Sequence, residues 1–478
     1  MTEAEAAVGS VRPAAVAGLF YPAEAAELRD DVAQFVGTAA DRAGHAPPGM
    51  RATPPTADPQ SPVPRAVIAP HAGYRYSGPT AGYAYHALAP ARDTVRRVVV
   101  VGPAHRVPLD GIGVTSARAW STPLGEMEVD GEAREVLKGI PGVVEADDAH
   151  APEHSIEVHL PFVHEVLGPV PVVPLVVGRT TPDVVARALD AVWDDDTTVI
   201  VASSDLSHYL DDASARHRDQ KTAGAILEGR SNEIGPRDAC GCLPISGLLT
   251  TAMKRGLAPR LLDLSTSADT AGEPSRVVGY GSFALLPAMP LSDDDRKWLL
   301  DLASRTIAHE LRTRERYPMD DDDVPIALRS PGASFVTLAR GDELLGCIGT
   351  LEPQRALWRD VVHNARAAAF EDPRFTPLTP DDAAGTTVEV SVLSRLQELS
   401  APSLEALASA LRPGTDGVVL AAEGLRGTFL PDVWEKIPEP VTFVRELVRK
   451  ARWEQPWVDG ARAWRYTTDA VMGPGDLV

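Results

Sequence analysis

Short, uninterrupted apolar runs rich in β-branched residues constrain the fold of this chain most. They occupy residues 65–70, 96–103, 169–178, 197–205 and 276–287, and helical stretches at 81–90, 181–193 and 213–229 lie between them. A strand with one solvated face alternates apolar and polar residues, whereas these runs do not alternate. The first part of the chain is therefore predicted to be α/β, with a largely parallel sheet covered by helices on both faces.

The length of 478 residues exceeds what one hydrophobic core usually supports. An apolar run ends near residue 289 and an acidic helix start follows, which marks a domain boundary. We predict a first domain over 1–288 and a smaller α+β domain over 289–478. Within the first, the proline-rich segment 43–65 is expected to form an exposed loop or insertion without catalytic residues.

The charge and cysteine content exclude several functional classes. With 46 Lys and Arg against 67 Asp and Glu, the net charge is −21, so neither nucleic acid nor an anionic membrane surface is an expected partner. The chain has no apolar run long enough for a transmembrane helix, and its acidic start lacks the pattern of a signal peptide. Three cysteines are too few for a disulfide framework. A cytoplasmic location is expected.

Polar side chains directly follow three of the predicted strands. His71 and His105 each follow one strand, and Asp205 and His208 follow a third. The carboxyl ends of parallel strands meet at one edge of a sheet, so these residues are expected to share a crevice. Because neutral imidazole is a common ligand of iron, copper and zinc, we predict a metal site there. Each histidine taken alone could equally be a cap or a satisfied surface group.

Cys240 stands just before an apolar stretch that is typical of a packed helix start. A helix N-terminus lowers the pKa of a nearby thiol, which would make Cys240 a better ligand or nucleophile. The alternative is a small buried hydrophobe. Cys242 points elsewhere on a helix and is not assigned a role.

A second group of polar residues lies in EHSIEVHLPF, which begins at Glu153. His154, Glu157 and His159 are spaced to share neighbouring parts of one helix face, and His150 and His164 lie close by in sequence. They could orient metal ligands through hydrogen bonds or line a substrate pocket. A polar helix entry without a functional role explains them equally well.

Seven segments in order resemble the Memo family: RPAAVAGLFYP from Arg12, PHAGYRYSG from Pro70, GPAHRVPLDGIGV from Gly102, TPLGEMEVD from Thr122, EHSIEVHLPF from Glu153, SSDLSHY from Ser203 and CGCLPISGLL from Cys240. The resemblance covers about residues 11–288. It implies a class III extradiol dioxygenase-like fold with a metal in its cleft. It also implies metal ligands at His71, His105 and Cys240, with Asp205 and His208 beside the metal. Tyr74 of the PHAGY motif is placed in the substrate pocket or among the residues that support the ligands.

This chain departs from the family at Arg106 and Leu243, where additional histidines are common. The three implied ligands are unaffected. A cysteine ligand is softer than the carboxylate of extradiol dioxygenases, so dioxygenase activity does not follow from the resemblance alone. The expected cofactor is one mononuclear metal ion, with iron first and copper or zinc as alternatives.

The expected function is that of a metal-dependent oxidoreductase with an unidentified substrate, in which His208 is the general acid or base. Two alternatives stay open. The cleft could be a recognition pocket of a non-catalytic binding protein, or the metal could be zinc and activate water for hydrolysis. The substrate would be a small molecule or a modified peptide.

The second domain carries segments that resemble the AMMECR family: LLGCIGTLEP from Leu344, AAAFEDPRFTPLT from Ala367, VEVSVLSRLQEL from Val388, GTFLPDVWE from Gly427 and VTFVRELVRKA from Val441. Leu345 replaces the arginine that is usual in the first motif. Cys347 is a candidate nucleophile with His363 as a possible partner, and the alternative is a buried structural cysteine. A packing surface or a binding groove is expected to be shaped by Phe375, Pro377, Phe429, Pro431 and Trp434.

The two resemblances together imply components B and A of the AmmeMemoRadiSam system, fused in that order. That system associates Memo-like, AMMECR-like and radical-SAM proteins. The present chain has no CxxxCxxC cluster motif of its own. A radical-SAM protein is therefore an expected separate partner.

Overall fold

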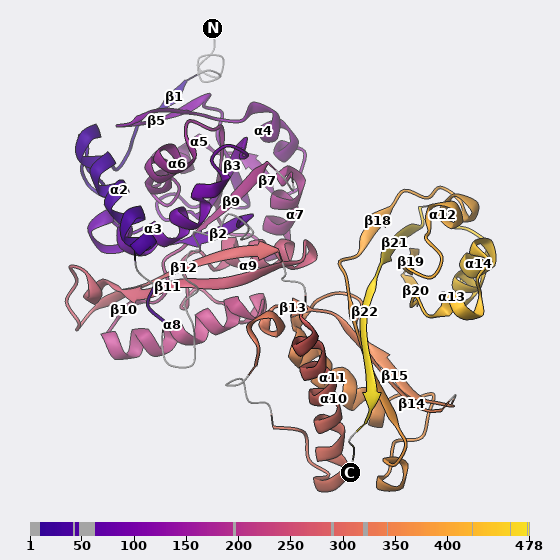
Figure 1. The fold of residues 1–478 in the computed structure, drawn as a ribbon. Helices are drawn as coiled ribbons and strands as arrows, with labels where there is room; N and C mark the ends of the chain where they lie inside the picture. Colours follow the sequence, from indigo (N-terminus) through magenta and orange to yellow (C-terminus); the bar gives the residue numbers. More distant parts are fainter. Residues whose placement is uncertain are drawn as a thin grey trace. The chain divides into compact units, whose positions relative to one another are not determined.

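The computed structural model describes residues 10–41, 44–46, 63–194, 197–287, 291–318, 324–341, 343–422, 424–458, 460–475 and 477. The chain divides into two compact units (Figure 1). The first carries the elements from β1 (Val11–Arg12) to β12 (Val277–Pro287), and the second those from α10 (Asp293–Thr313) to β22 (Thr468–Pro474). Most of the proline-rich segment and the expected boundary at 288–290 lie outside the described residues.

A nine-stranded sheet forms the centre of the described part of the first unit, in the order β10-β12-β2-β9-β3-β8-β4-β7, with β11 pairing with β12. Its strands are β2 (Ala66–Ala69), β3 (Arg97–Pro103), β4 (Ile112–Val114), β7 (Val143–Glu145), β8 (Val172–Val177), β9 (Thr198–Ser203), β10 (His208–Leu210), β11 (Leu257–Thr266) and β12. A small sheet is formed by β1, β5 (Ala119–Thr122) and β6 (Gly125–Glu128).

The large sheet is mixed, which corrects the expectation of a largely parallel one. Strands β2, β9, β3 and β8 are parallel neighbours, as the apolar runs predict. However, β12 pairs antiparallel with β2, β10 and β11, and β4 pairs antiparallel with β8. An apolar run with both faces buried looks the same in either direction, so the sequence could not distinguish the orientation of the run at 276–287.

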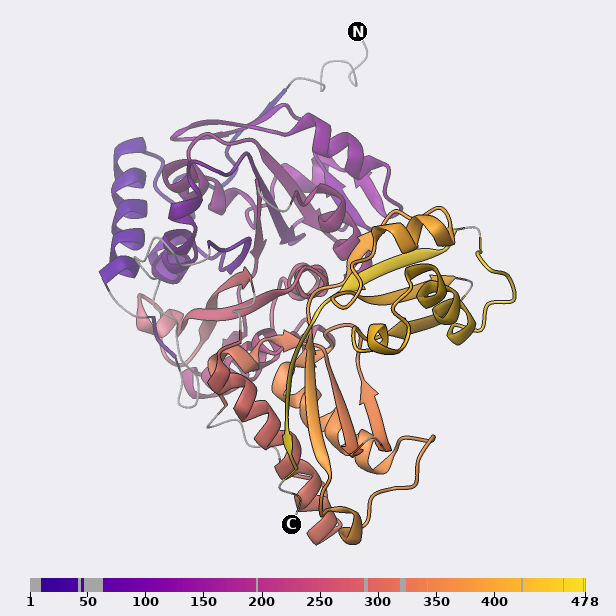
Figure 2. The same cartoon turned by 45° about the vertical axis from the view of Figure 1, so that its right-hand side comes forward.

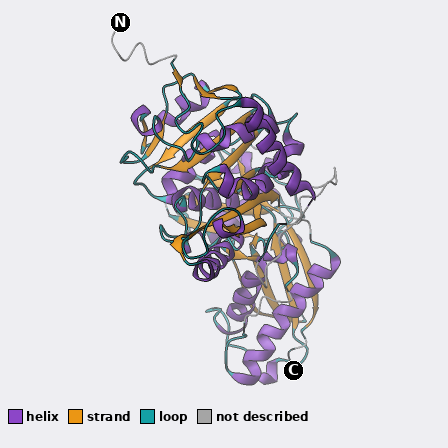
Figure 3. Ribbon diagram, turned by 90° about the vertical axis from the view of Figure 1, so that its left-hand side faces the viewer, coloured by secondary structure: helices purple, strands orange, loops and turns teal. Residues whose placement is uncertain are grey.

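Helices cover both faces of this sheet (Figure 3). They are α2 (Ala25–Asp41), α3 (Tyr74–Leu88), α4 (Gly131–Lys138), α5 (Asp147–His150), α6 (Leu160–Leu167), α7 (Pro182–Val192), α8 (Asp212–Leu227) and α9 (Cys242–Lys254), with the 3-10 turn η2 at Glu157–His159. Adjacent strand residues belong to different cores: Val67 packs with α2, α3 and α6, and Ile68 with α4, α7, α8 and α9. Burial on both faces explains why the apolar runs do not alternate.

The second unit contains two four-stranded antiparallel sheets among its described residues. The first has the order β15-β14-β17-β22, with β22 drawn in yellow at its edge in Figure 2, and the second has the order β18-β21-β19-β20. Their strands are β14 (Ser334–Arg340), β15 (Glu343–Gly349), β17 (Thr387–Leu393), β18 (Gln397–Leu399), β19 (Gly417–Ala422), β20 (Leu425–Phe429), β21 (Arg462–Tyr466) and β22. A two-stranded ladder joins β13 (Pro331–Gly332) to β16 (Arg355–Ala356).

Helices pack on these two sheets and give the unit an α+β arrangement. The helices are α10, α11 (Leu357–Phe370), α12 (Leu404–Ala410), α13 (Val433–Lys436) and α14 (Pro440–Lys450). Helices α10 and α11 share a core with the first sheet, and α12 and α14 share one with the second. Among the described residues of the whole chain, no helix combines the length and apolar character that crossing a membrane requires.

Candidate metal centre in the first unit

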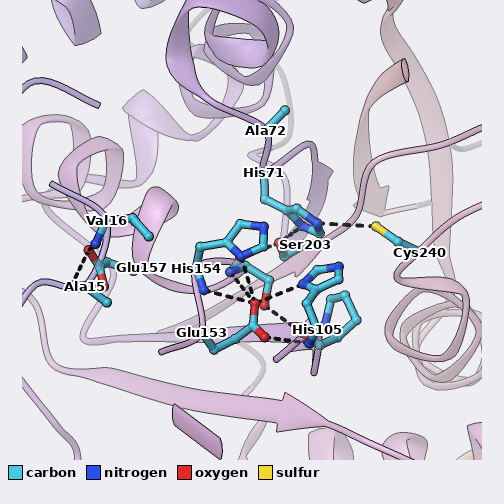
Figure 4. Close-up of polar contacts among 12 residues, drawn as sticks. Ala15, Val16, His71, Ala72, His105, Glu153, His154, Glu157, Ser203 and Cys240 are labelled. Carbon is cyan, nitrogen blue, oxygen red and sulfur yellow. Dashed lines mark hydrogen bonds and ion pairs between the residues drawn. The ribbon is translucent and has the colours of Figure 1, made fainter. Parts of the chain in front are cut away.

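Three histidines lie together near the carboxyl ends of the parallel strands β2 and β3. His71 lies two residues after β2 and His105 two residues after β3, and His154 comes from the turn before η2. Each offers a ring nitrogen, and these atoms lie within 4.8 Å of one another. Figure 4 shows the three rings facing one another with Cys240 beside His71. Such a spacing suits one metal ion shared by several imidazoles.

The protonation of His71 follows from its hydrogen bonds. Ser203 Oγ lies 2.5 Å from Ser155 O, so its hydroxyl proton goes to that carbonyl. The same oxygen must then accept from His71 Nδ1, which lies 2.6 Å away. His71 Nδ1 therefore carries the ring proton and Nε2 keeps a free lone pair. Burial lowers the pKa of His71 well below its usual value, and neighbouring imidazoles lower it further.

The Ser203 hydroxyl also receives a second imidazole, that of His159. His159 Nε2 lies 2.9 Å from Ser203 Oγ, and Tyr85 OH lies 2.9 Å from His159 Nδ1. Because Ser203 accepts here too, His159 Nε2 is protonated and Nδ1 accepts from Tyr85. Burial lowers the pKa of His159 to about 3. His159 thus supports His71 through Ser203 and does not face the other two rings itself.

Glu153 orients the second histidine. Its Oε1 lies 2.9 Å from His105 Nδ1, and its Oε2 accepts from the His105 backbone N–H at 2.6 Å. Burial alone would raise the pKa of Glu153, but hydrogen bonds from His105 and Ser155 hold it at about 2. The ionised carboxylate accepts a hydrogen bond from His105 Nδ1–H, which leaves His105 Nε2 as the free ligand atom. Carboxylate–histidine pairs of this kind commonly fix metal ligands.

His154 completes the group. Its ring stacks on that of His105 with centroids 4.8 Å apart, and Phe20 packs against it at 4.5 Å. Burial lowers the pKa of His154 to about 4, so the ring is neutral at pH 7. His154 Nδ1 has no hydrogen-bond partner among the described residues, although it lies 3.2 Å from Glu153 Oε1.

Cys240 reaches the cluster from the segment before α9. Its Sγ lies 3.3 Å from His71 Nε2, which has no proton, and 3.5 Å from Asp205 O, so the thiol has two acceptors within reach. Gly241 permits this approach, because a Cβ there would lie 2.4 Å from Ser203 O. The expected lowering of the thiol pKa is wrong. Burial raises the pKa of Cys240, and the charge of Asp205 raises it further.

Asp205 lies on the loop after β9, and His208 begins β10 directly after that loop. Asp205 Oδ1 accepts from the backbone N–H of His71 at 2.8 Å, and thereby fixes the turn that carries this histidine. Burial raises the pKa of Asp205, and the nearby His208 opposes the rise. His208 Nδ1 lies 2.8 Å from Leu206 O, so Nδ1 is the donor and Nε2 is free to accept a proton.

Glu157 is not part of the cluster; of the roles left open by the sequence, the structure does not place it against the metal ligands. Its carboxylate accepts from Arg12 Nη1 at 2.6 Å, from Tyr21 OH at 2.7 Å, and from the backbone N–H groups of Ala15 and Val16. Figure 4 shows it turned away from the histidines. Glu157 therefore anchors the N-terminal segment. Glu153 and Glu157 start from different turns of the chain and point in different directions, so only Glu153 reaches the histidines.

Tyr74 is also placed away from the imidazoles. Its hydroxyl donates to Val158 O at 2.8 Å, and its ring packs against Phe162 with centroids 5.0 Å apart. His150 lies 3.0 Å from Gly113 O, and His164 lies 3.0 Å from the Glu165 carboxylate. The core position of Tyr74 follows from helix α3, which presents this residue to the sheet.

The sequence predictions missed Ser203, and they named Glu153 only as a member of the EHSIEVHLPF group. Ser203 links His71 to His159, and Glu153 holds His105, yet the expected supporting carboxylate was Glu157. Ser203 is the last residue of β9 and stands directly before Ser204 and Asp205. A hydroxyl at that strand end was the available signal. Gly102 was a second signal, because a glycine there leaves room for the neighbouring Ser155 side chain. A Cβ at Gly102 would lie 2.7 Å from Ser155 Oγ.

In the second unit, Cys347 lies on β15 and His363 on α11, and the structure does not pair them. Gly346 faces α11, because a Cβ there would lie 2.0 Å from Ala368 O. Side chains alternate along a strand, so Cys347 lies on the opposite face. The two residues are therefore separated by the sheet, which no spacing in the sequence reveals.

Comparisons with known proteins agree with the division of the chain into two units. The Memo-like protein family matches residues 12–284, and the AMMECR1 family matches residues 300–471. A MEMO1 family protein of Sulfolobus acidocaldarius is 34% identical over 284 residues, which is 56% of this chain and 97% of that protein. One from Methanopyrus kandleri is 36% identical over 285 residues, 57% of this chain and 97% of its own length.

Among solved structures, the chain is similar to an uncharacterized protein of Pyrococcus horikoshii. The identity is 28%, and the match covers 38% of this chain and 93% of that protein. The TM-score of 0.36 is too low to establish a shared fold. The family matches carry the assignment: this chain belongs to the Memo family and joins a Memo-like domain to an AMMECR1 domain.

Proposed function

We propose that the Memo-like domain is a metal-dependent oxidoreductase that holds one ion at His71, His105 and Cys240. The observation that carries the proposal is the convergence of ring nitrogens of His71, His105 and His154 within 4.8 Å, and Cys240 Sγ lies 3.3 Å from His71 Nε2. His71 Nε2 and His105 Nε2 are left free because the other nitrogen of each ring is already hydrogen-bonded. Hydrogen bonds of this kind fix the tautomer that a metal requires.

The donor set fits a first-row transition metal. Neutral imidazoles suit iron, copper and zinc, and a thiolate adds preference for soft ions such as Cu(I). Iron is proposed first, with copper or zinc as alternatives. When bound, a redox-active ion would supply one-electron chemistry and an open position for substrate. Loading requires Cys240 to lose its thiol proton.

Residues next to these ligands would handle protons and orientation. Asp205 holds the backbone of His71 and thereby sets the direction of that ring. His208 Nε2 is free to accept a proton, and we assign it the role of general acid or base. His154, which stacks on His105, would face the substrate side of the centre.

The substrate we propose is a small molecule or a modified peptide. A radical-SAM protein is the proposed partner, since the chain resembles the Memo-like and AMMECR-like components that are associated with such a protein. Its three cysteines do not form a cluster motif of their own.

Metal analysis after anaerobic purification tests the proposal. We expect about one iron or copper per chain, with dioxygen uptake on exposure to air. His105→Ala should lose the metal, whereas His164→Ala, a histidine beside Glu165, should keep it. Absence of metal from every preparation, including reconstituted protein, would refute the oxidoreductase and favour a recognition pocket. A redox-silent zinc without oxygen uptake would favour hydrolysis.

A further inference from the structure

A cavity of about 500 Å³ lies beside helix α8 in the first unit. Three parts of the chain contribute its lining residues, which are Leu210, Ser214, His217, Arg218, Lys221 and Asp238. The four from α8 are at positions 214, 217, 218 and 221, a spacing that places them on one face of the helix. The proposed metal ligands are not among the lining residues, and the volume is in the range that small molecules occupy.

Two local structures build the walls opposite α8. The register of β10 against β12 shifts between His208 and Leu210, and Tyr209 between them has a φ of 61°, in the left-handed region. Such a bulge changes the direction of the side chains around it, and Leu210 contributes an apolar surface to the cavity. On the other side, Asp238 Oδ2 accepts from the backbone N–H of Gly235 at 3.0 Å and closes a turn.

Positive charge dominates the α8 side of the cavity. Arg218 donates one hydrogen bond, from Nη1 to Arg237 O at 3.3 Å, and has no ion pair in the described part of the chain. Lys221 is exposed, and its ammonium has neither a hydrogen-bond nor an ion-pair partner among the residues that the structure describes. The two cations are three positions apart on one helix face, where like charges destabilise a helix.

The acidic residues at and near the start of α8 are engaged elsewhere. Asp212 Oδ2 accepts from Arg216 Nε at 2.9 Å, and Asp211 Oδ1 caps the helix by accepting from the backbone N–H of Ser214 at 3.0 Å. Asp219 lies on the buried side of the helix. The positive charge in the cavity is therefore not neutralised by the carboxylates of its own helix.

We propose that this cavity binds a small molecule through a phosphate or carboxylate group. Arg218 offers a planar fork of donors and Lys221 a compact point charge, and both suit either group. His217 adds a third donor on the same face. An anion between the two cations would offset their repulsion. Because Asp238 repels an anion, the uncharged part of the molecule would lie toward Asp238 and Leu210.

Labelling of Lys221 in the full chain by pyridoxal phosphate tests the site. The lysine amine condenses with the aldehyde and water leaves; borohydride then transfers hydride to the carbon of the C=N bond, and the nitrogen takes a proton from water. Pyridoxal forms the same bond without the phosphate. The ratio of the two labelling yields therefore reports the attraction of the phosphate group.

Mass spectrometry of the labelled peptides assigns this ratio to each lysine separately. Lys254 serves as the internal control, because it is exposed and has no ion-pair partner in the described ranges of the chain. Any intrinsic difference between the two aldehydes affects both lysines equally and cancels when Lys221 is compared with Lys254.

We expect the ratio at Lys221 to exceed that at Lys254 at least about threefold. Arg218→Gln should lower the ratio at Lys221 about two- to fivefold, as the loss of one nearby charge predicts in a solvated site. Asp238→Asn should raise it. Arg187→Gln removes the same charge from α7, whose residues do not line the cavity, and should leave the ratio unchanged.

Inorganic phosphate and succinate distinguish the two kinds of anionic group. Either should protect Lys221 from pyridoxal phosphate beyond the effect of sodium chloride at equal ionic strength. Stronger protection by phosphate assigns a phosphate ligand, and stronger protection by succinate assigns a carboxylate ligand. Equal ratios at Lys221 and Lys254, or no protection by either anion, would overturn the site. So would equal effects of Arg218→Gln and Arg187→Gln.

Discussion

Cys240 and Cys347 are both half-buried thiols beside a serine or threonine hydroxyl, but the charges around them differ in sign. Cys240 contacts the His71 imidazole and is influenced by the carboxylate of Asp205. Cys347 lies beside the guanidinium of Arg374. Burial raises the pKa of both thiols, which Asp205 reinforces at Cys240 and Arg374 opposes at Cys347. Lone pairs and negative charge suit a metal cation, whereas positive charge suits an anion.

The comparison shows that the role of a cysteine depends on residues that are distant in sequence. Asp205 precedes Cys240 by 35 positions in the sequence, and His71 precedes Cys240 by many more. Arg374 follows Cys347 by 27 positions. The motifs around the two cysteines do not contain these partners. Variants that alter one set of neighbours should therefore change one unit and leave the other intact.

Removal of a ligand should have the largest effect. His71→Ala deletes the ring that Ser203 holds in its metal-binding tautomer. Metal content should therefore fall from about one ion per chain to below about a tenth. Mass spectrometry of the anaerobic protein measures this. If His71→Ala retained a full complement of metal, the contrast between the two thiols would lose its basis.

Glu157 tests whether its segment serves stability rather than metal binding. Glu157→Ala leaves Arg12 buried without its carboxylate, and should lower the free energy of unfolding of the first unit by about 3–5 kcal/mol. Urea denaturation measures the change. Glu165→Ala removes partly exposed contacts with Arg29 and His164 and should cost less than about 1 kcal/mol. Metal loss from folded Glu157→Ala protein would contradict the purely structural role.

Glu153 should behave in the opposite way. Glu153→Gln retains the shape but weakens the hydrogen bond that orients His105 Nδ1. Metal affinity should fall about 10- to 100-fold, the usual effect of removing a residue that orients a ligand. Competition with a chelator measures the affinity. An unchanged affinity would show that His105 needs no orienting carboxylate.

The two units also differ in how the surroundings of a buried carboxylate shift its pKa. Asp372 is paired with Arg374, and hydrogen bonds from that residue lower its pKa to about 2. Asp219 of the first unit is 1% exposed, its Oδ2 lacks a hydrogen-bond partner among the described residues, and burial raises its pKa to about 6. The folded state therefore binds the Asp219 proton more tightly than the unfolded state, and stability falls as pH rises from about 4 to 6.

Asp219→Asn should remove this loss of stability with rising pH. The variant should gain about 1–3 kcal/mol relative to wild type between pH 4 and pH 7, because a shift of about two pKa units corresponds to about 3 kcal/mol at most. Urea denaturation of the first unit at both pH values checks the gain, and Asp93→Asn, an exposed aspartate, serves as control. An equal stability difference at both pH values would contradict an ionised, unpaired Asp219.

The sequence predicted the elements of the fold better than their directions. The apolar runs became β2, β3, β8, β9 and β12, and the helical stretches at 81–90, 181–193 and 213–229 overlap α3, α7 and α8. The direction of β12 was not predictable, because its pairing with β2 depends on a long connection and not on local pattern. The rule that carboxyl ends of parallel strands converge was sufficient to bring His71 and His105 together.

The details around the ligands were less accessible from the sequence. The roles of Glu153 and Glu157 depend on which way each carboxylate points after a tight turn, and the sequence spacing favoured Glu157. The thiol pKa of Cys240 depends on burial and on Asp205, which outweigh the proximity of a helix start. The partners of Cys347 come from the segment after α11, so only the assembled unit reveals them.

The central claim is that Cys240 belongs to a metal centre and Cys347 does not. Metal content of wild type, Cys240→Ala and Cys347→Ala, purified anaerobically side by side, tests this most directly. The account predicts about one iron or copper ion per chain in the wild type and in Cys347→Ala, and little metal in Cys240→Ala. Full metal content in Cys240→Ala, or its loss in Cys347→Ala, would contradict it.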